Sequence, residues 1–282
     1  MNYFEHIEKC NSHDLDTFRP FLLEDIELGY FRDEFATKLL SFSDVFEELG
    51  NGLTLSIEFK NFTTRSQAID EVVKELILQG DLPNLRNEFY PVTTDFFKPP
   101  YFQLDRAVIP FFGIRAFGVH LNGFITDPDG SKHLWVARRA ADRLVCPGML
   151  DNTVAGGQPI GIGLIENLMK ECDEEASIKE SLSKNAVPVG AVSYIMESET
   201  GLKPDTLYCF DLELPHEFLP KNKDGEISEF YLWPVEHVAK IVNEGFDFKF
   251  NCNLVLIDFF IRHGFIKPDY PHYLELIKGL RT

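Results

Sequence analysis

The sequence is poor in positive charge. Lys and Arg together number 27 against 45 Asp and Glu, which gives a formal net charge of −18. A surface this acidic repels nucleic-acid backbones and anionic membranes. We therefore expect neither a nucleic acid nor a membrane as a partner, whereas a small phosphorylated ligand stays compatible if a divalent cation screens its site.

Paired cysteines and long apolar runs are also missing. An odd, scattered set of cysteines predicts neither a disulfide framework nor a structural zinc site, and it favours a reducing, cytoplasmic setting. No stretch approaches the roughly 20 apolar residues of a membrane span, and the N-terminus has no basic segment followed by an apolar run, so we expect no secretory signal. The five cysteines, with no CxxC among them, are Cys10, Cys146, Cys172, Cys209 and Cys252.

Apolar residues, by contrast, are sufficient for a large core. They make up 44% of the 282 residues, and 26 of them are phenylalanines, so we expect an aromatic-rich interior. The pattern of apolar and turn-forming residues changes near residue 113, which predicts an N-terminal α+β domain over residues 1–113. A second domain is then expected over 114–250, followed by a C-terminal helical extension over 251–282.

Hydrophobic periodicity predicts the elements of each part. In the first part we expect short helical pieces at 15–21 and 35–40, a strand at 52–58 and a helix at 66–79. In the second part, two strands at 117–126 and 134–137 flank an Asp-Pro-Asp-Gly turn and predict a hairpin. The remaining elements expected are a glycine-rich loop at 149–163, a helix at 164–176, strands at 187–195 and 206–214 around a turn at 201–204, a strand at 230–233, and helices at 235–243, 254–263 and 273–281.

The helix expected at 164–176 carries the most informative pattern. At 3.6 residues per turn, Glu171 and Glu175 fall along one edge of its apolar face, and Glu174 turns further outward. Like charges at this spacing repel, and carboxylates at a core margin also lose hydration. A hard divalent cation such as Mg²⁺ would turn both costs into a binding site. The apolar face is expected to comprise Leu164, Ile165, Leu168, Met169, Cys172 and Ala176.

The loop that precedes this helix supports a ligand site. Gly156 and Gly157 permit close approach of the backbone to a ligand, and a carbonyl there could complete a metal shell. Acidic runs on helices usually face solvent, so the carboxylates alone would favour a solvated face. The glycine loop, together with the placement of Glu171 and Glu175 beside the apolar face, favours a metal site.

These residues resemble the Nudix family. Gly156 matches the first glycine of the Nudix box, and residues 170–178 (KECDEEASI) match its second half. The resemblance implies an α/β/α sandwich with a mixed sheet, so that the whole chain is of the α+β class with a smaller α+β domain in front. It also implies Mg²⁺ or Mn²⁺ held by Glu171, Glu174, Glu175 and Gly156, and hydrolysis of a diphosphate bond. Three positions depart from the box: Ile162 replaces the early glutamate, Lys170 replaces the arginine, and Ser177 replaces the late glycine.

Longer motifs resemble one Nudix subgroup that is associated with thiamine diphosphate metabolism and also occurs fused to thiamine pyrophosphokinase. This resemblance implies hydrolysis of thiamine diphosphate, or of its oxidised analogues, to the monophosphate and phosphate. The subgroup carries an N-terminal domain of unsettled role. The motifs are PGMLDNTVAGG (147–157), YIMESE (194–199), LYCFDLELP (207–215), LDRA (104–107), FGIR (112–115), GVHLNG (118–123) and GYFRDEF (29–35).

Further candidates lie outside the helix. Arg138 and Arg139 could grip a diphosphate, since guanidinium suits phosphate oxygens, although surface charge at a strand end is the plainer interpretation. We expect Lys170 and Gly157 at the substrate as well. In Nudix enzymes a later loop often supplies a further acid, so Glu226 and Glu229 join Glu174 and Glu175 as catalytic candidates; two exposed loop glutamates are an equally good interpretation. His120 and His133 are expected to be packed or surface side chains and not ligands.

Several alternatives stay open. The same scaffold suits a nucleotide-sugar or dinucleotide diphosphatase. The changes at Ile162 and Lys170 would also suit a binding module that has lost turnover, and diphosphate isomerases use the same fold. A homodimer is left open, and the exact substrate is not determined, because a base-binding pocket is built by side chains distant in the sequence.

Overall fold

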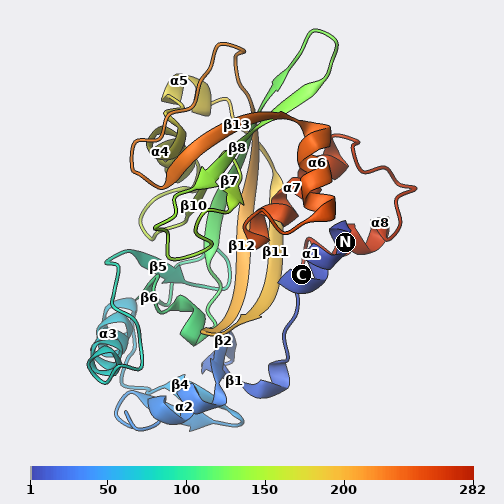
Figure 1. Cartoon of the computed structure of the whole chain (residues 1–282). Coiled ribbons are helices and arrows are strands. Elements are labelled where there is room, and N and C mark those ends of the chain that lie inside the picture. The colour runs from blue at the N-terminus through green and yellow to red at the C-terminus, as the bar shows by residue number, and fades with distance from the viewer. Residues whose placement is uncertain (1) are drawn as a thin grey trace.

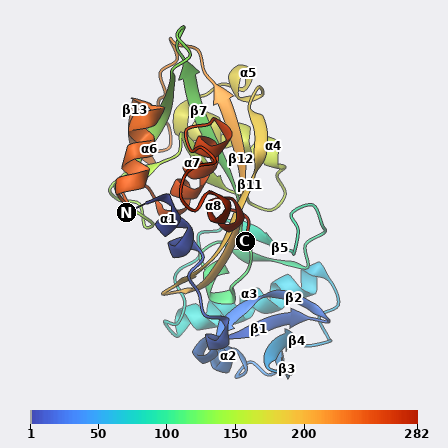
Figure 2. The ribbon, with the colours of Figure 1, turned by 90° about the vertical axis from the view of Figure 1, so that its right-hand side faces the viewer.

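The computed structural model describes residues 2–282 and contains two regions that lie one above the other (Figure 1). The N-terminal region, residues 18–112, consists of small sheets and two helices. Above it stands one large mixed sheet with helices on both faces. Figure 2 shows the same arrangement from the side, with both ends of the described chain on the larger part.

The N-terminal region is built around phenylalanine rings. Its four-stranded sheet has the order β2-β1-β4-β3, in which β1 and β4 run parallel, and β5 and β6 form a separate hairpin. Phe21, Phe31, Phe46, Phe102 and Phe112 are fully buried at its centre, which confirms the aromatic-rich interior. The elements are β1 (Phe18–Leu23), β2 (Ile26–Arg32), α2 (Asp33–Leu39), β3 (Phe46–Leu49), β4 (Gly52–Leu55), α3 (Phe62–Leu78), β5 (Phe89–Val92), β6 (Phe102–Asp105) and the 3₁₀ helix η2 (Ile109–Phe112).

The large sheet has seven strands. The path runs β11-β12-β7-β8-β13, with β10 also paired to β7 and β9 to β8. The pair β7 and β12 is parallel, whereas the other pairs are antiparallel, so the sheet is mixed as expected. The strands are β7 (Phe117–Thr126), β8 (Lys132–Arg139), β9 (Leu150–Asp151), β10 (Val154–Gly157), β11 (Val187–Ser198), β12 (Gly201–Glu213) and β13 (Ile227–Pro234).

Each face of this sheet has its own hydrophobic core. On one face, α4 (Leu164–Ala176) and α5 (Glu180–Ser183) pack over β7 and β12. On the other face lie α6 (Val235–Glu244), α7 (Phe250–Arg262) and α8 (Tyr273–Gly279). The α/β/α sandwich is therefore confirmed. Within residues 2–282, no helix combines the length and apolar character that a membrane crossing requires.

The first helix belongs to this second core and not to the sheet that follows it in sequence. Helix α1 (Tyr3–Cys10) packs beside α7 and α8 (Figure 2). The Tyr3 hydroxyl donates to the Ala239 carbonyl at 3.0 Å, and His6 Nε2 lies 2.7 Å from the Val242 carbonyl. The chain thus starts in the larger part, builds the N-terminal region, and returns.

Four local predictions were wrong. Residues 15–21 form only a 3₁₀ turn, η1 (Leu15–Thr17), before β1 begins, and the buried Phe18 and Phe21 belong to that strand, with Phe21 in the aromatic core. Residues 149–163 hold β9 and β10 and are not one loop. Residues 201–204 begin β12, so the turn lies before them. Ile165 is 50% exposed, and the buried face of α4 holds Asn167 instead.

Candidate active site

Helix α4 lies along strand β10 and contacts it once per turn. Asn167 Nδ2 donates to the Gly157 carbonyl at 2.8 Å, and the Ala155 amide donates to Glu175 Oε2 at 2.9 Å. Between them the Glu171 carboxyl lies against Gly156, where an added Cβ would come within 2.5 Å of the carboxyl carbon. Positions 167, 171 and 175 are one turn apart, so they share one face of the helix.

Burial differs sharply among the three glutamates of this helix. Glu175 is 4% exposed as a residue, and the side chains of Glu171 and Glu174 are 14% and 46% exposed. Burial raises the pKa of Glu171, although Lys170 opposes the shift, and it raises the pKa of Glu175 well above the ordinary value for a glutamate. Glu171 and Glu175 are therefore partly desolvated carboxyls that a cation would stabilise.

The donor set fits a hard divalent cation. Carboxylate oxygens and a backbone carbonyl are the ligands that Mg²⁺ and Mn²⁺ take in proteins, and here Glu171 and Glu175 lie against the neighbouring residues Gly156 and Ala155 of β10. Glu174 lies on the solvent side, where Lys170 Nζ is 2.9 Å from its carboxylate and 3.1 Å from that of Glu171. Lys170 thus neutralises the candidate metal ligands themselves, and it does not face the cavity.

The loop before β13 brings Glu226 to this helix. The Lys221 amide donates to the Ala176 carbonyl at 3.1 Å, and the Lys223 amide donates to the Glu174 carbonyl at 3.0 Å. These bonds hold residues 221–226 against the end of α4. Repulsion from Glu226 adds to the burial that raises the pKa of Glu171, and Glu226 itself pairs with Arg143 at 2.7 Å.

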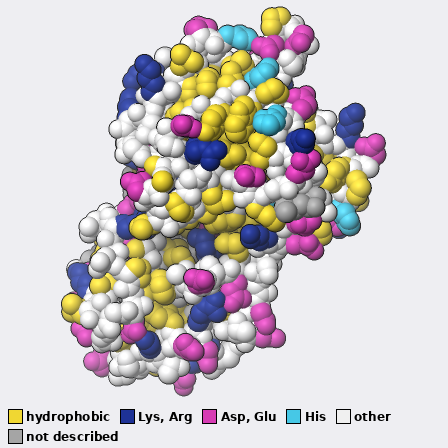
Figure 3. Space-filling view, viewed as in Figure 1, with side chains coloured by type: hydrophobic (Ala, Val, Ile, Leu, Met, Phe, Trp, Pro, Cys, Tyr) yellow, Lys and Arg dark blue, Asp and Glu magenta, His cyan; other side chains and the backbone are white. Residues whose placement is uncertain are grey.

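A cavity of about 590 Å³ opens on the other side of β10, between the two regions. We call it the central cavity. Its walls include Gly156, Gly157 and Glu226 together with four aromatic rings, Tyr90, Phe111, Phe117 and Phe250. Six cationic side chains line it against two acids, Asp205 and Glu226, although the chain as a whole is strongly acidic. The six are Arg86, Arg106, Arg139, Arg143, Lys203 and Lys249. Figure 3 shows Lys and Arg side chains beside apolar ones at the level where the two regions meet.

Strand β5 of the N-terminal region closes directly on the glycine strand. A Cβ on Gly157 would lie 1.6 Å from the Tyr90 hydroxyl oxygen, so only glycine leaves room for Tyr90. The Ile160 amide donates to the Phe89 carbonyl at 2.9 Å. Burial raises the pKa of Tyr90, and Glu171 adds to the shift, so the phenol stays protonated close to the acidic helix.

A buried polar cluster supports the cavity floor. Asp151 pairs with Arg139 at 2.8 Å and lies 3.9 Å from Lys249 Nζ, while Cys252 Sγ donates to it at 2.7 Å. Burial would raise the pKa of Asp151, but Lys249 and Arg139 outweigh it and lower the pKa. His120, Asp151 and Cys252 lie close enough to hold a metal; however, two cations already neutralise Asp151, which disfavours a third. The expectation of His120 as a packed side chain agrees with its 3% exposure.

The structure does not bring every candidate to the cavity. Arg138 is absent from its lining, because its guanidinium bonds the Tyr231 hydroxyl at 2.9 Å and the Gly148 carbonyl at 2.8 Å. Glu229 is also absent from the lining; it is exposed and accepts from Tyr231. Arg139 lines the cavity, but all of its guanidinium nitrogens already donate to Asp151, Val145 and Cys146. Arg139 therefore contributes positive charge to the cavity, but its guanidinium is not free to bind a phosphate through two parallel hydrogen bonds.

Sequence reasoning missed the N-terminal contribution. Arg86, Tyr90 and Arg106 come from the region before residue 113, and Lys203 and Lys249 were also overlooked. The one available signal was the LDRA motif at 104–107, which contains Arg106 and had no role attached to it.

Comparisons with known proteins show what the chain is similar to. The chain is 43% identical to Nudix hydrolase 20, chloroplastic, of Arabidopsis thaliana over 291 residues, covering 99% of this chain and 78% of the relative. It is 41% identical to Nudix hydrolase 24, chloroplastic, of the same plant over 284 residues, with the same coverage. A family model described as "Domain of unknown function (DUF4743)" matches residues 2–116. A solved structure from Deinococcus radiodurans aligns with a TM-score of 0.47 at 17% identity, covering 60% of this chain and 97% of that one.

The sandwich and these relatives define an enzyme that acts on phosphoric anhydrides. Its relatives make the family plain: the chain belongs to the Nudix hydrolases. These enzymes hydrolyse diphosphate bonds in small molecules and generally use divalent metals.

Proposed function

We propose that the chain hydrolyses the diphosphate group of a small organic molecule in the central cavity, with Mg²⁺ or Mn²⁺ as the metal. Glu171, Glu174, Glu175 and the Gly156 carbonyl would hold the ion. The observation that carries the proposal is the packing of Glu171 and Glu175 against β10, which places two partly desolvated carboxyls beside a cation-rich cavity.

The metal would polarise the phosphate oxygens and make water a better nucleophile at neutral pH. The residues of the chain divide the remaining tasks. Arg143 and the buried Arg139 supply positive charge toward the leaving phosphate. Glu226 would accept the proton of the attacking water, a role supported by its position in the cavity lining and its ion pair with Arg143. The water oxygen bonds to one phosphorus, the P–O–P bridge breaks, and the two products are a monophosphate and orthophosphate.

Thiamine diphosphate or its oxidised analogues are the proposed substrates. The subgroup motifs support them, and so does the cavity, whose volume lies within the range of about 300–1,000 Å³ that small-molecule sites occupy. Tyr90, Phe111, Phe117 and Phe250 line it and offer faces for a pyrimidine or thiazole ring.

A hydrolysis panel tests this proposal. Thiamine diphosphate, oxythiamine diphosphate, ADP-ribose and a dinucleoside tetraphosphate are each incubated with the protein and Mg²⁺, and the products are identified. We expect orthophosphate and a thiamine-type monophosphate, with turnover reduced about 10³-fold in Glu171→Gln and unchanged in Glu166→Gln, an exposed position on the same helix.

Each other outcome has a definite meaning. Release of AMP from the nucleotides, with the thiamine compounds untouched, would replace the proposed substrate by a nucleotide diphosphate derivative. Rearranged product without phosphate would indicate an isomerase. Inertness toward all four compounds would overturn the proposed hydrolysis.

A further inference from the structure

The wall of the central cavity that faces β10 comes from the N-terminal region. Arg86 and Arg106 lie on it, and the aromatic ring of Tyr90 stands between this wall and Gly157. Two arginines of the N-terminal region therefore line the same cavity as the glycine strand. Arginine is the side chain that best matches the oxygens of a phosphate, because its planar fork can donate two parallel hydrogen bonds.

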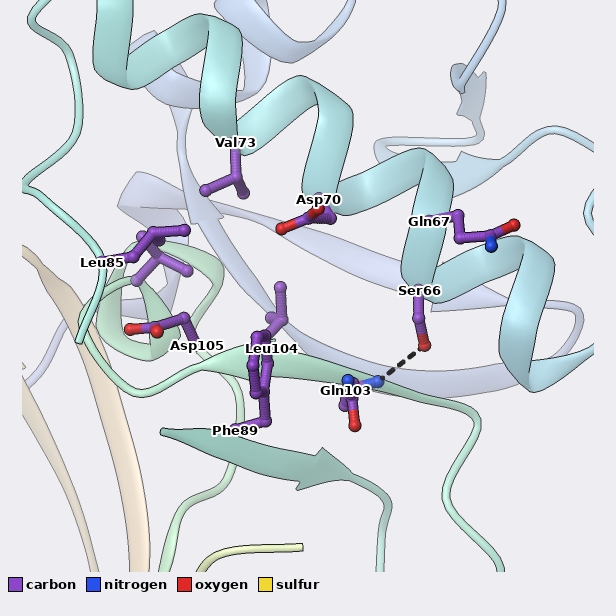
Figure 4. Close-up of a pocket in the computed structure, with 10 residues that line it drawn as sticks. Ser66, Gln67, Asp70, Val73, Leu85, Phe89, Gln103, Leu104 and Asp105 are labelled. Carbon is purple, nitrogen blue, oxygen red and sulfur yellow. Dashed lines mark hydrogen bonds between the residues drawn. The ribbon is translucent and has the colours of Figure 1, made fainter. Parts of the chain in front are cut away.

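The backbone that carries these arginines is held by one buried carboxylate. Asp105, 3% exposed, accepts from the amides of Arg86 at 3.1 Å, Asn87 at 2.7 Å and Ala107 at 2.9 Å. Asn87 has a left-handed backbone with φ of 59°, a conformation that a side chain rarely adopts without such support. In Figure 4, Asp105 lies at the end of β6 on the side of Leu85, which directly precedes Arg86.

The small pocket drawn in Figure 4 lies behind this wall and offers no competing site. It measures about 150 Å³ and is lined by α3, β5 and β6. The Gln103 amide donates to Ser66 Oγ at 3.2 Å within it, and the Asp105 carboxylate is taken up by the backbone amides. Asp105 is therefore a positioning residue for the two segments that carry Arg86 and Arg106.

The two arginines differ in how free they are. Arg106 pairs with Glu88, and its guanidinium lies 5.9 Å from the centre of the Tyr90 ring. Arg86 is exposed, and within residues 2–282 its side chain has neither a hydrogen bond nor an ion pair. An unpaired arginine at the edge of a cation-rich cavity in an acidic protein concentrates anions there.

We propose that the N-terminal region is part of the substrate site, with Arg86 and Arg106 binding the phosphate groups of the diphosphate substrate. This inference rests on the proposed function for the identity of the ligand. The anion is held between the arginines of the N-terminal region and the α4–β10 site, so the enzyme needs both regions to bind its substrate.

Calorimetric titration with methylene bisphosphonate and Mg²⁺ tests the proposal, because the P–C–P bridge of this probe resists hydrolysis. We expect Arg86→Gln to weaken its binding about tenfold and Arg106→Gln to weaken it at least as much. Arg106→Lys, which keeps the charge without the fork, should recover part of the affinity. Arg65→Gln is the matched control, because Arg65 lies on α3 outside the cavity lining and donates to the Phe59 carbonyl; it should bind the probe as the unaltered protein does.

The same variants are then assayed with the best substrate of the panel. We expect KM to rise about tenfold in Arg86→Gln while kcat changes less than threefold, because Arg86 binds phosphate away from the metal ligands. Unchanged affinity and unchanged KM in both Arg86→Gln and Arg106→Gln would overturn this inference while leaving the proposed hydrolysis intact. If the probe binds in an arginine-dependent way but the protein hydrolyses none of the compounds, the proposed hydrolysis is overturned and this inference about phosphate binding stands.

Discussion

The acidic edge of α4 and the cationic wall of the N-terminal region both pack against strand β10 but are encoded in different ways. Glu171, Glu174 and Glu175 are neighbours on one helix, so helical geometry alone brings them together. Arg86 and Arg106 reach the site only because β5 docks on β10 and Asp105 holds the segments between. The metal site is thus a local property of the sequence, whereas the substrate wall is a property of the whole fold.

The largest effect is expected at Glu175, on the acidic side. In Glu175→Gln the amide oxygen can still accept from Ala155, but the negative charge is lost. We expect kcat to fall about 10³-fold, equivalent to about 4 kcal/mol of transition-state stabilisation. Without metal, the free energy of unfolding should stay equal or rise, because a buried carboxyl no longer has to be accommodated. Steady-state kinetics and urea unfolding measure both; retained turnover would remove Glu175 from the proposed metal site.

The second prediction concerns the contact between β5 of the N-terminal region and β10 of the larger part. In Gly157→Ala the new methyl would meet the Tyr90 hydroxyl, so β5 and β10 must move apart. We expect kcat/KM to fall about 10²-fold, since displacements near 1 Å have effects of that size.

Gly163→Ala is the control for this variant, because a methyl there meets nothing within 4 Å and its φ of −75° suits alanine. Replacing Tyr90 by Phe in the Gly157→Ala background removes the oxygen that the methyl would meet most closely and should recover part of kcat/KM. Equal activity of the Gly157→Ala and Gly163→Ala proteins would mean that the cavity tolerates a wider gap than the structure shows.

A smaller effect concerns His120 beneath the cavity. Burial lowers its pKa from 6.5 to about 4. Because protonation then favours the unfolded chain, the stability contributed by neutral His120 is complete above about pH 6.5 and is lost as the pH falls toward 4. Between pH 7 and pH 5 the loss amounts to about 2 kcal/mol. Urea unfolding at both values should show it, and His120→Asn should reduce the difference; an identical pH dependence in both proteins would contradict the buried, neutral histidine.

The elements that sequence predicted well are those with strong local periodicity. The expected bounds 117–126 and 164–176 coincide with β7 and α4 in the structure. The box and the long motifs indicated the family, and helical periodicity indicated that Glu171 and Glu175 lie at the edge of the buried face. Ile165 was misplaced, and the burial of Asn167 was not predicted, because apolar periodicity cannot anticipate that an amide would be buried to bind the Gly157 carbonyl.

The rest of the site depends on contacts distant in sequence. Nothing around Arg86 marks it as different from Arg65, since only the fold turns one into the cavity and leaves the other on α3. The same holds for Arg138 and Arg139, which are adjacent in β8. Because side chains alternate along a strand, Arg138 and Arg139 point to opposite faces of the sheet. Arg139 lines the cavity, whereas Arg138 donates a hydrogen bond to the Tyr231 hydroxyl.

Helix α1 also limits how the two regions can move. Because α1 is packed between α6, α7 and α8, the N-terminal region is attached to the larger part at two points, through residues 11–17 and 113–116. These two attachments restrict how far the regions can separate, in addition to the contact of β5 with β10. A chain shortened to start at residue 114 would lose both the cationic wall and a helix of its own core.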